Sequence, residues 1–516
     1  ADNPPSGTFY DPDRNAVAME SLGVHEHWNN ATDKLYTRNL GKGNGIELFK
    51  ISNPGGLPVV MSLNRMQLNF AYVMGGSLPG PQSFMITRTG SGVCSWMAEE
   101  NTSWFDNSPT SGNNAAKITV SVDPSGLAGG TYTGVISVTD LNSSGTALAL
   151  TVNLKIFSSG TDLQPFGNFA TPVEGSTVRS SIPVTGWVLD DVGVESVKIY
   201  RQDGAGLVYI GDALTVEGAR PDVEIAYPGY PMNYKAGWGY MMLTHFLPGG
   251  GNGSFTFYVV ARDSSGHEVT LGTRTVTCDN AHAVKPFGAI DTPAQGGEAS
   301  GLKYRNQGWV LTPVPNNIPS TGKTINVYID GVYKGHPIYN IYRPDVASLF
   351  PGYANSNGSL GYFDFDTTHY DDGVHTIYWV AEDNAGNADG IGSRYFSVRN
   401  PVGDRGRQSL GRGEPACPPH SSVLESQFVY ARKNGNRIIE IKELERIEIR
   451  VGANAVGYQL VAGQRRPLPI GSTLDSGRGI FYWTPGPGFL GKYDFIFIIS
   501  DKTGRRVPQD ITIKIY

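Results

Sequence analysis

The sequence predicts an all-β protein, and three observations support this fold class. Glycine (66) and proline (33) are abundant among the 516 residues, and both residue types mark turns. Aromatic and β-branched residues fill short segments in which apolar and polar positions alternate, as they do in half-buried strands. Several motifs occur twice, about one domain length apart. We therefore expect a linear array of four β-sandwiches behind a short irregular N-terminal segment.

Charge and hydropathy exclude several classes of function. The net charge is −6 and only 17% of residues are charged, without the basic stripe that follows phosphates, so nucleic acid is not an expected partner. No apolar run reaches the roughly 18 residues of a membrane-spanning helix, and Ala1 opens a polar stretch. The expectation is an extracellular or cell-surface protein without a membrane span, whose signal peptide is absent from this chain.

Residues 1–60 form the expected irregular segment. The stretch 21–30 resembles the C-terminal tail of a bacterial family of unknown function. Within it, His25 and His27 are two residues apart, so on a strand both imidazoles point to one face and can reach one metal ion. No third ligand follows from the spacing. The two histidines are kept as a candidate metal pair, with an ordinary surface pair as the favoured alternative.

Residues 61–160 are expected to form the first sandwich. Two tryptophans, Trp96 and Trp104, supply large anchors for a small core, and the glycine-rich stretch 126–134 feeds an alternating strand. These motifs resemble a BACON domain, a family attached to carbohydrate-active proteins. The resemblance implies glycans as a candidate ligand, whereas the residue chemistry favours both tryptophans as core.

Residues 161–280 and 281–400 are expected to be two copies of one module. In both, a Pro-Phe-Gly opening is followed by a Gly-Trp-Val-Leu strand and, near the end, by an Ala-x-Asp-x-x-Gly hairpin. This order of motifs resembles a bacterial Ig-like domain. The alignment places Cys278 opposite Val398 on a closing strand, so Cys278 is expected in the core. The three cysteines fall in three different segments, which argues against a disulfide framework.

Each copy also carries an Arg-Pro-Asp-Val motif followed by Pro-Gly-Tyr, and this pair admits two interpretations. In the first, the repeated residues grip a glycan or a neighbouring molecule. In the second, which we favour, the arginine and aspartate pair with each other and tie a long loop to the sandwich, while the tyrosine caps its core. The residues concerned are Arg220, Asp222 and Tyr230 in the first copy, and Arg343, Asp345 and Tyr353 in the second.

The stretch 235–240 occurs only in the first copy. Its aromatic residues, Trp238 and Tyr240, are therefore the candidates for a contact that is specific to this module.

Residues 401–421 are rich in glycine, arginine and proline and are expected to be a linker. The last module, 422–516, contains a Trp-x-Pro turn and ends on an alternating strand. It resembles a cadherin-like, Ig-type family. A terminal strand of this kind either closes its own domain or pairs with a neighbour.

No residue set predicts an enzyme. The neighbouring carboxylates Asp190 and Asp191 are expected in a turn, because adjacent residues of an extended chain point to opposite faces. Turn carboxylates at Asp263, Asp383 and Asp501 are candidates for Ca²⁺ sites between modules, although no Ca²⁺-loop motif is present.

The expected function is a non-catalytic, extracellular structural or adhesive protein. Such a cell-surface rod would contact a surface partner or assemble head-to-tail into a filament. The alternative is a glycan-binding accessory region of a larger secreted enzyme.

Overall fold

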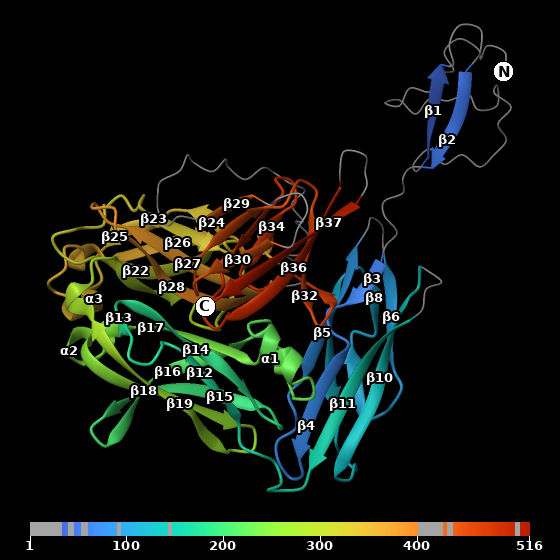
Figure 1. Ribbon diagram of the computed structural model, residues 1–516, viewed down its shortest axis with the longest axis horizontal. Helices are drawn as coiled ribbons and strands as arrows, with labels where there is room; N and C mark the ends of the chain where they lie inside the picture. Colours follow the sequence, from blue (N-terminus) through green and yellow to red (C-terminus); the bar gives the residue numbers. More distant parts are fainter. Residues whose placement is uncertain are drawn as a thin grey trace. The chain divides into compact units, whose positions relative to one another are not determined.

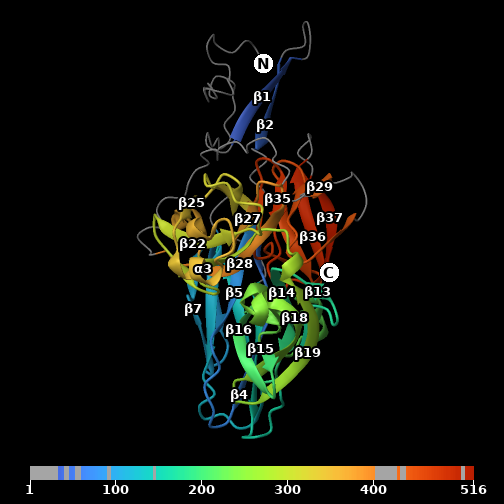
Figure 2. The ribbon, with the colours of Figure 1, turned by 90° about the vertical axis from the view of Figure 1, so that its left-hand side faces the viewer.

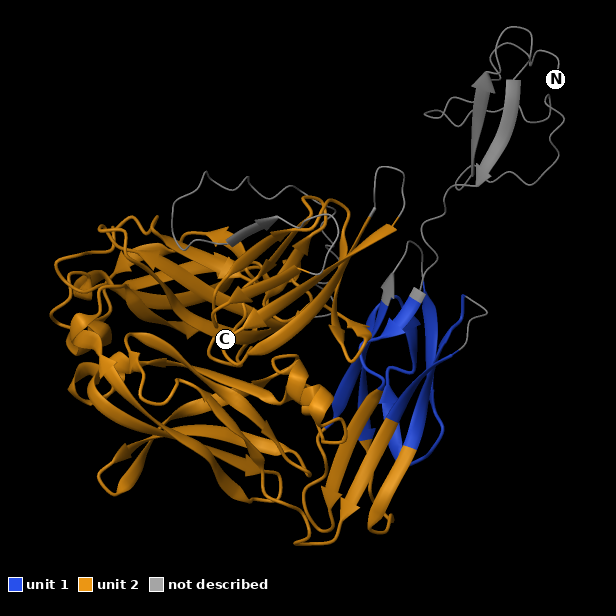
Figure 3. Ribbon diagram, in the orientation of Figure 1, with its two compact units in different colours: residues 1–66, 81–121, 134–151 blue, residues 67–80, 122–133, 152–516 orange. Residues whose placement is uncertain are grey.

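A computed structural model describes residues 33–39, 46–52, 60–89, 94–142, 147–400, 427–430, 437–500 and 506–516. Strands dominate these ranges, which confirms the all-β class (Figure 1). The chain forms two compact units (Figure 3), one of residues 1–66, 81–121 and 134–151, the other of residues 67–80, 122–133 and 152–516. No helix among the described residues is long and apolar enough to cross a membrane.

The N-terminal segment contains regular structure where an irregular segment was expected. Strands β1 (Asp33–Asn39) and β2 (Ile46–Ser52) pair antiparallel, with Asp33 opposite Ser52. The physical reason lies in the sequence, because aromatic and β-branched residues flank a Gly-rich stretch at 41–45, which is the composition of a hairpin.

The first sandwich consists of two sheets. Its four-stranded sheet has the order β3 (Val60–Leu63), β5 (Gln82–Thr89), β9 (Ala116–Val122), β7 (Phe105–Ser108). Its five-stranded sheet has the order β4 (Gln67–Val73), β11 (Leu148–Phe157), β10 (Gly130–Asp140), β6 (Ser95–Glu100), β8 (Ser111–Asn113). Trp96 is buried, and its indole N–H donates to the carbonyl of Asn114, so the core interpretation of this tryptophan is confirmed. Trp104 is half-buried, with its ring edge against Phe105.

Repeat 1, residues 161–280, folds as one continuous sheet. The sheet has the order β12 (Phe166–Thr171), β14 (Ser181–Leu189), β17 (Gly237–Leu243), β16 (Gly206–Val216), β15 (Val194–Asp203), β18 (Asn252–Asp263), β19 (Glu268–Asp279), β13 (Thr177–Val178). Short helices lie in its connections: α1 (Pro221–Ala226), η2 (Asn233–Lys235), η3 (Thr244–Phe246), α2 (Pro248–Gly251) and η4 (Asn280–His282). Strand β16 pairs with both β15 and β17 and so joins the two faces of the sandwich. Cys278 is buried in the core between them, as expected.

Repeat 2, residues 281–400, has the same strand plan split into two sheets. One has the order β20 (Phe287–Thr292), β22 (Tyr304–Leu311), β26 (Leu360–Phe365), β25 (Ile338–Ile341). The other has the order β21 (Glu298–Ala299), β28 (Ala388–Val398), β27 (Gly373–Glu382), β23 (Ile325–Ile329), β24 (Val332–Gly335). The short helices are α3 (Pro344–Leu349), η5 (Ser356–Gly358) and η6 (Thr367–His369). Trp379 lies at the centre of the core and donates to the side chain of Asn306 at 2.7 Å.

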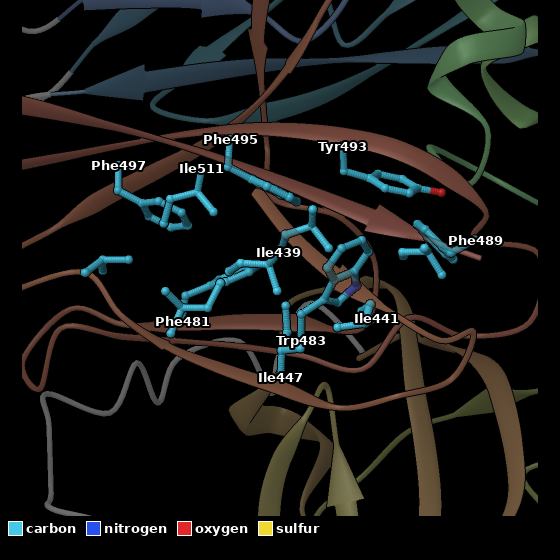
Figure 4. Packing of buried hydrophobic residues seen from close by; sticks show 14 of the residues in the cluster. Ile439, Ile441, Ile447, Phe481, Trp483, Phe489, Tyr493, Phe495, Phe497 and Ile511 are labelled. Carbon is cyan, nitrogen blue, oxygen red and sulfur yellow. The ribbon is translucent and has the colours of Figure 1, made fainter. Parts of the chain in front are cut away.

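The C-terminal module is a third β-sandwich in the second unit. Its four-stranded sheet has the order β29 (Gln427–Tyr430), β31 (Ile447–Arg450), β35 (Ile480–Trp483), β34 (Ser472–Asp475). Its five-stranded sheet has the order β30 (Arg437–Ile441), β37 (Arg506–Ile515), β36 (Gly491–Ser500), β32 (Val456–Val461), β33 (Gln464–Arg466). Figure 4 shows its aromatic core, with Trp483 between Phe489, Tyr493 and Phe495. The terminal strand β37 pairs on both sides, with β30 and β36, and so closes its own domain.

The C-terminal module packs against both repeats instead of following them end to end. Its hydrophobic core includes Val216 and Ala219 of repeat 1 and Tyr395 of repeat 2. In both views the red C-terminal strands lie beside green repeat 1 and gold repeat 2 (Figure 1 and Figure 2). The linear order predicted for these three modules therefore holds along the sequence, while in space they share one core.

The buried hydroxyl of Tyr395 tests this shared core. Its Oη donates to the carbonyl of Pro487 at 2.9 Å, and the residue is 2% exposed. Tyr395→Phe leaves that carbonyl without its donor, so we expect a loss of about 1–2 kcal/mol in the free energy of unfolding, measured with urea. The control is Tyr342→Phe, since Tyr342 is 60% exposed. Equal effects of the two variants would contradict the shared core.

Candidate functional site

The Arg-Pro-Asp-Val motifs begin two short helices, α1 and α3, with proline in the first turn. In repeat 1, Arg220 donates through Nε and Nη2 to the two carboxylate oxygens of Asp222, at 2.8 and 2.6 Å. In repeat 2, Arg343 donates through Nε to Asp345 at 2.9 Å and also bonds Asp291 through Nη1. The arginine and aspartate of each motif thus form the local pair that the structural interpretation requires. Contact of these residues with an external ligand stays a prediction.

Helix α1 lies where repeat 1 meets the C-terminal module. Glu224 in the helix forms an ion pair with Arg466, with 2.7 Å between Glu224 Oε1 and Arg466 Nη1, and both side chains are largely buried. Tyr493 donates its hydroxyl to the carbonyl of Ala219, just before the motif. The motif of repeat 1 therefore contributes to a junction between modules of the second unit.

Each motif also completes an aromatic cluster. The two clusters contain equivalent residues: Phe166, Trp187, Tyr227 and Tyr230 in repeat 1, and Phe287, Trp309, Phe350 and Tyr353 in repeat 2. Burial raises the pKa of both Tyr230 and Tyr353, so these hydroxyls stay neutral. Both tyrosine rings pack against the phenylalanine in the first strand of their own module, Tyr230 against Phe166 and Tyr353 against Phe287.

The aromatic cluster of repeat 2 is covered by repeat 1. His245 stacks on Phe287, with ring centroids 3.8 Å apart, and Phe246 contacts the rings of Trp309 and Phe350. Burial lowers the pKa of His245 to about 4, so its ring is neutral at pH 7. The sequence offered no signal for this junction, because His245 and Phe287 belong to different modules.

Trp238 does not present its side chain to a partner. It is fully buried in the core of repeat 1, next to Phe169, so the prediction of an indole contact specific to this module needs correction. The backbone next to Trp238 contacts the C-terminal module instead. A Cβ added to the neighbouring Gly239 would lie 2.3 Å from the carbonyl carbon of Pro487. Tyr240 is half-buried, with its ring over Gly211. The occurrence of a stretch in only one repeat does not determine whether its side chains are buried.

The carboxylates of the turns hold backbone groups. Asp190 accepts from the backbone N–H groups of Val192 and Gly193, at 2.8 and 2.9 Å, and so forms the expected turn. The two hairpin aspartates, Asp263 and Asp383, each accept backbone N–H groups of the residues that follow them. The metal-ligand candidates His25, His27 and Asp501 lie outside the described residues.

Glu443 is a half-buried acid that the sequence did not single out. It reaches from the C-terminal module to repeat 1, where Thr171 Oγ1 donates to its Oε2 at 3.1 Å, and the N–H of Gly488 donates to its Oε1 at 3.2 Å. Burial raises its pKa to about 7, against the weaker opposing effect of these hydrogen bonds. The interface therefore contains a carboxyl group that titrates near neutral pH.

No family model matches this chain, and no curated protein matches it. Similar solved structures include Sidekick-1 immunoglobulin domains 1–5, with 10% identity over 89% of this chain and 79% of that chain and a TM-score of 0.21. A Ca²⁺-stabilized adhesin of an Antarctic bacterium has 12% identity, covers 88% of this chain and 99% of that chain, and has a TM-score of 0.14. Fibronectin(III)-like modules of Clostridium thermocellum CbhA have 13% identity, cover 48% of this chain and 100% of that chain, and have a TM-score of 0.15. At these TM-scores the similarities carry no conclusion about this chain.

Gly239 tests the backbone contact between repeat 1 and the C-terminal module. Gly239→Ala introduces a methyl group against the backbone of Pro487, so we expect a loss of about 1–3 kcal/mol in the free energy of unfolding. The matched control is Gly229→Ala in the same repeat, where an added Cβ meets nothing within 4 Å. Thermal unfolding of both variants makes the comparison, and a wild-type melting temperature for Gly239→Ala would exclude the contact.

The raised pKa of Glu443 predicts that the free energy of unfolding depends on pH. Its folded pKa, about 7, lies above its ordinary value of 4.5, so the stability that it contributes is complete below about pH 4.5 and is lost as the pH rises through 7. Glu443→Gln keeps a carbonyl acceptor and removes this titration. We expect wild type to lose about 1–3 kcal/mol more than the variant between pH 4.5 and 8, measured by urea unfolding at each pH. Parallel pH curves for the two proteins would show that Glu443 is not the titrating group.

Proposed function

We propose that this protein is a non-catalytic, extracellular structural or adhesive protein. The observation that carries the proposal is the hydrophobic core that the C-terminal module shares with both repeats. Burial of apolar surface between modules opposes their separation, which is the property that a load-carrying or spacing protein needs. Modules joined only by linkers would lack this resistance.

The polar groups of the interface support a structural role. His375 and Asp330 form a pair of the kind found in some catalytic sites, with Nδ1 and Oδ2 2.6 Å apart. Here the other ring nitrogen bonds the carbonyl of Asp371 at 2.8 Å, and the carbonyl of Asp330 accepts from Thr473 of the C-terminal module at 3.0 Å. His375 thus fixes a turn of repeat 2, and the carbonyl of Asp330 joins this turn to the C-terminal module.

The proposal also assigns a family to each module. Residues 61–160 would be a BACON-like module and 422–516 a cadherin-like module, on either side of the two Ig-like repeats. The glycan-binding accessory region of a secreted enzyme is the alternative function, and it depends on the BACON resemblance.

The contact surface that we favour is the tip of the hairpin formed by β15 and β16. Leu207, Val208 and Tyr209 are 47%, 38% and 50% exposed. Consecutive residues of a strand point to opposite faces, so both faces of this tip are open. Large apolar side chains on such a projection suit a protein partner or a second copy of the chain. Because β37 is paired on both sides, a filament would assemble through surfaces of this kind and not by donation of the terminal strand.

The proposal is tested with the purified full chain. Light scattering at increasing concentration and electron microscopy measure assembly, while a glycan array and adhesion to bacterial surface fractions measure partner binding. We expect self-association or adhesion that falls at least tenfold in the double variant Leu207→Ser with Tyr209→Ser. The control is Leu302→Ser, since Leu302 is 63% exposed in repeat 2. Glycan binding without assembly or adhesion would favour the accessory region instead.

A further inference from the structure

Three segments of the second unit bring acidic groups together at one end of repeat 1. Asp162 precedes β12, Asp190 follows β14, and Asp263 ends β18. The side chains of Asp162 and Asp263 are 1% and 0% exposed, and Asp190 as a residue is 1% exposed. Nδ1 of His267 lies 3.2 Å from Asp162 Oδ2 and 2.9 Å from Asp263 Oδ2. Ligand atoms of Asp162, Asp263 and His267 all lie within 4.8 Å of one another.

Repeat 2 shows what the hairpin needs for folding. The residue equivalent to Asp263 is Asp383, whose Oδ2 accepts from three neutral groups, Thr312 Oγ1 at 3.0 Å, Asn316 Nδ2 at 3.1 Å and Asn387 Nδ2 at 3.0 Å. These donors satisfy the buried carboxylate without a second charge. One aspartate with neutral partners is therefore sufficient for this turn.

Repeat 1 places ionisable groups where repeat 2 has neutral ones. By the alignment of the two copies, Asp190 replaces Thr312, His267 replaces Asn387 and Asp162 replaces Ala283. In repeat 2 the side chain at the position of Asp190, Thr312, donates to the hairpin carboxylate of Asp383. Oδ2 of Asp190 has no hydrogen-bond partner, although it is buried. Repeat 1 thus has a second carboxylate where repeat 2 has a hydroxyl donor.

Electrostatics disfavours this arrangement without a cation. Buried carboxylates of this kind are protonated, paired or bound to a metal ion. His267 supplies at most one positive charge for the three carboxylates of Asp162, Asp190 and Asp263.

We propose that Asp162, Asp190 and Asp263, together with His267, bind a divalent cation that ties the two loops of repeat 1 to the segment preceding β12. Carboxylate oxygens are the preferred ligands of Ca²⁺ and Mn²⁺, and an imidazole nitrogen in addition suits Mn²⁺ or Zn²⁺. The cation replaces the neutral donors that hold the corresponding turn of repeat 2. It takes the position between the carboxylates that the Nδ1 proton of His267 otherwise bridges.

The experiment uses the full chain after removal of metals with a chelator. Ca²⁺, Mn²⁺ and Zn²⁺ are each titrated by calorimetry, and thermal unfolding is followed with each ion in excess. We expect one ion per chain and a rise in Tm of roughly 5 °C at about 100 times the dissociation constant. Absence of a Tm shift and of stoichiometric binding with all three ions would overturn the proposal.

The variant that copies repeat 2 supplies the specific test. Asp162→Ala, Asp190→Thr and His267→Asn together recreate neutral groups that already serve the fold in repeat 2. We expect this triple variant to melt above metal-free wild type at pH 8 and to lose the metal response. Asp190→Asn alone is the second variant, in case the triple variant does not fold, and we expect at least a tenfold weaker affinity. Asp364→Asn in repeat 2 is the control that keeps the response, and a response kept by the cluster variants would place the cation elsewhere.

The variant His267→Asn shows whether the imidazole is a ligand of the cation. A Ca²⁺ response that survives this change identifies an oxygen-only site, whereas loss of a Mn²⁺ or Zn²⁺ response identifies the imidazole as a ligand. If wild type instead gains stability only on lowering the pH from 8 to 6, with no effect of any ion, the carboxylates share a proton and the proposal fails. Assembly and adhesion are measured separately, so failure here leaves the proposed function intact.

Discussion

The burial of two tyrosine hydroxyls holds the second unit together. Tyr395 of repeat 2 donates to Pro487 of the C-terminal module, and Tyr493 of that module donates to Ala219 of repeat 1. Each ring adds apolar area to one shared core, and each hydroxyl is buried at low cost because a backbone carbonyl accepts it. The packing of helix α1, the backbone contact at Gly239 and the burial of Glu443 all depend on this closeness of the three modules.

Duplication gave both repeats the same local structure, and their surroundings use it differently. In each copy the helix that begins at the arginine–proline pair completes a four-ring aromatic cluster. In repeat 2 the cluster is covered by His245 and Phe246 of the preceding module. In repeat 1 the helix contacts the C-terminal module through Glu224. One motif thus serves two kinds of junction, because only its inner face is constrained by its own module.

The hairpin carboxylates diverge in the same way. Asp383 is satisfied by neutral donors, and its pKa is lowered by the hydrogen bonds from Asn387 and other neighbours, which outweigh its burial. Asp263 has the same position, but Asp162 lies close to it and Asp190 replaces the hydroxyl donor Thr312. A fold that needs one carboxylate tolerates additional ones only if a proton or cation compensates them, and this is the physical basis for the difference between the two repeats.

The sequence by itself determined the all-β class, the duplicated module, the core position of Cys278 and the turn at Asp190. These features depend on alternation, turn chemistry and internal alignment, which act over a few neighbouring residues. Only the tertiary structure decided that Trp238 is buried, that the C-terminal module packs on both repeats, and that Asp162 meets Asp263 and His267. Each of these depends on residues far apart in the chain, whose closeness follows from sheet pairing and module packing, and no local pattern records it.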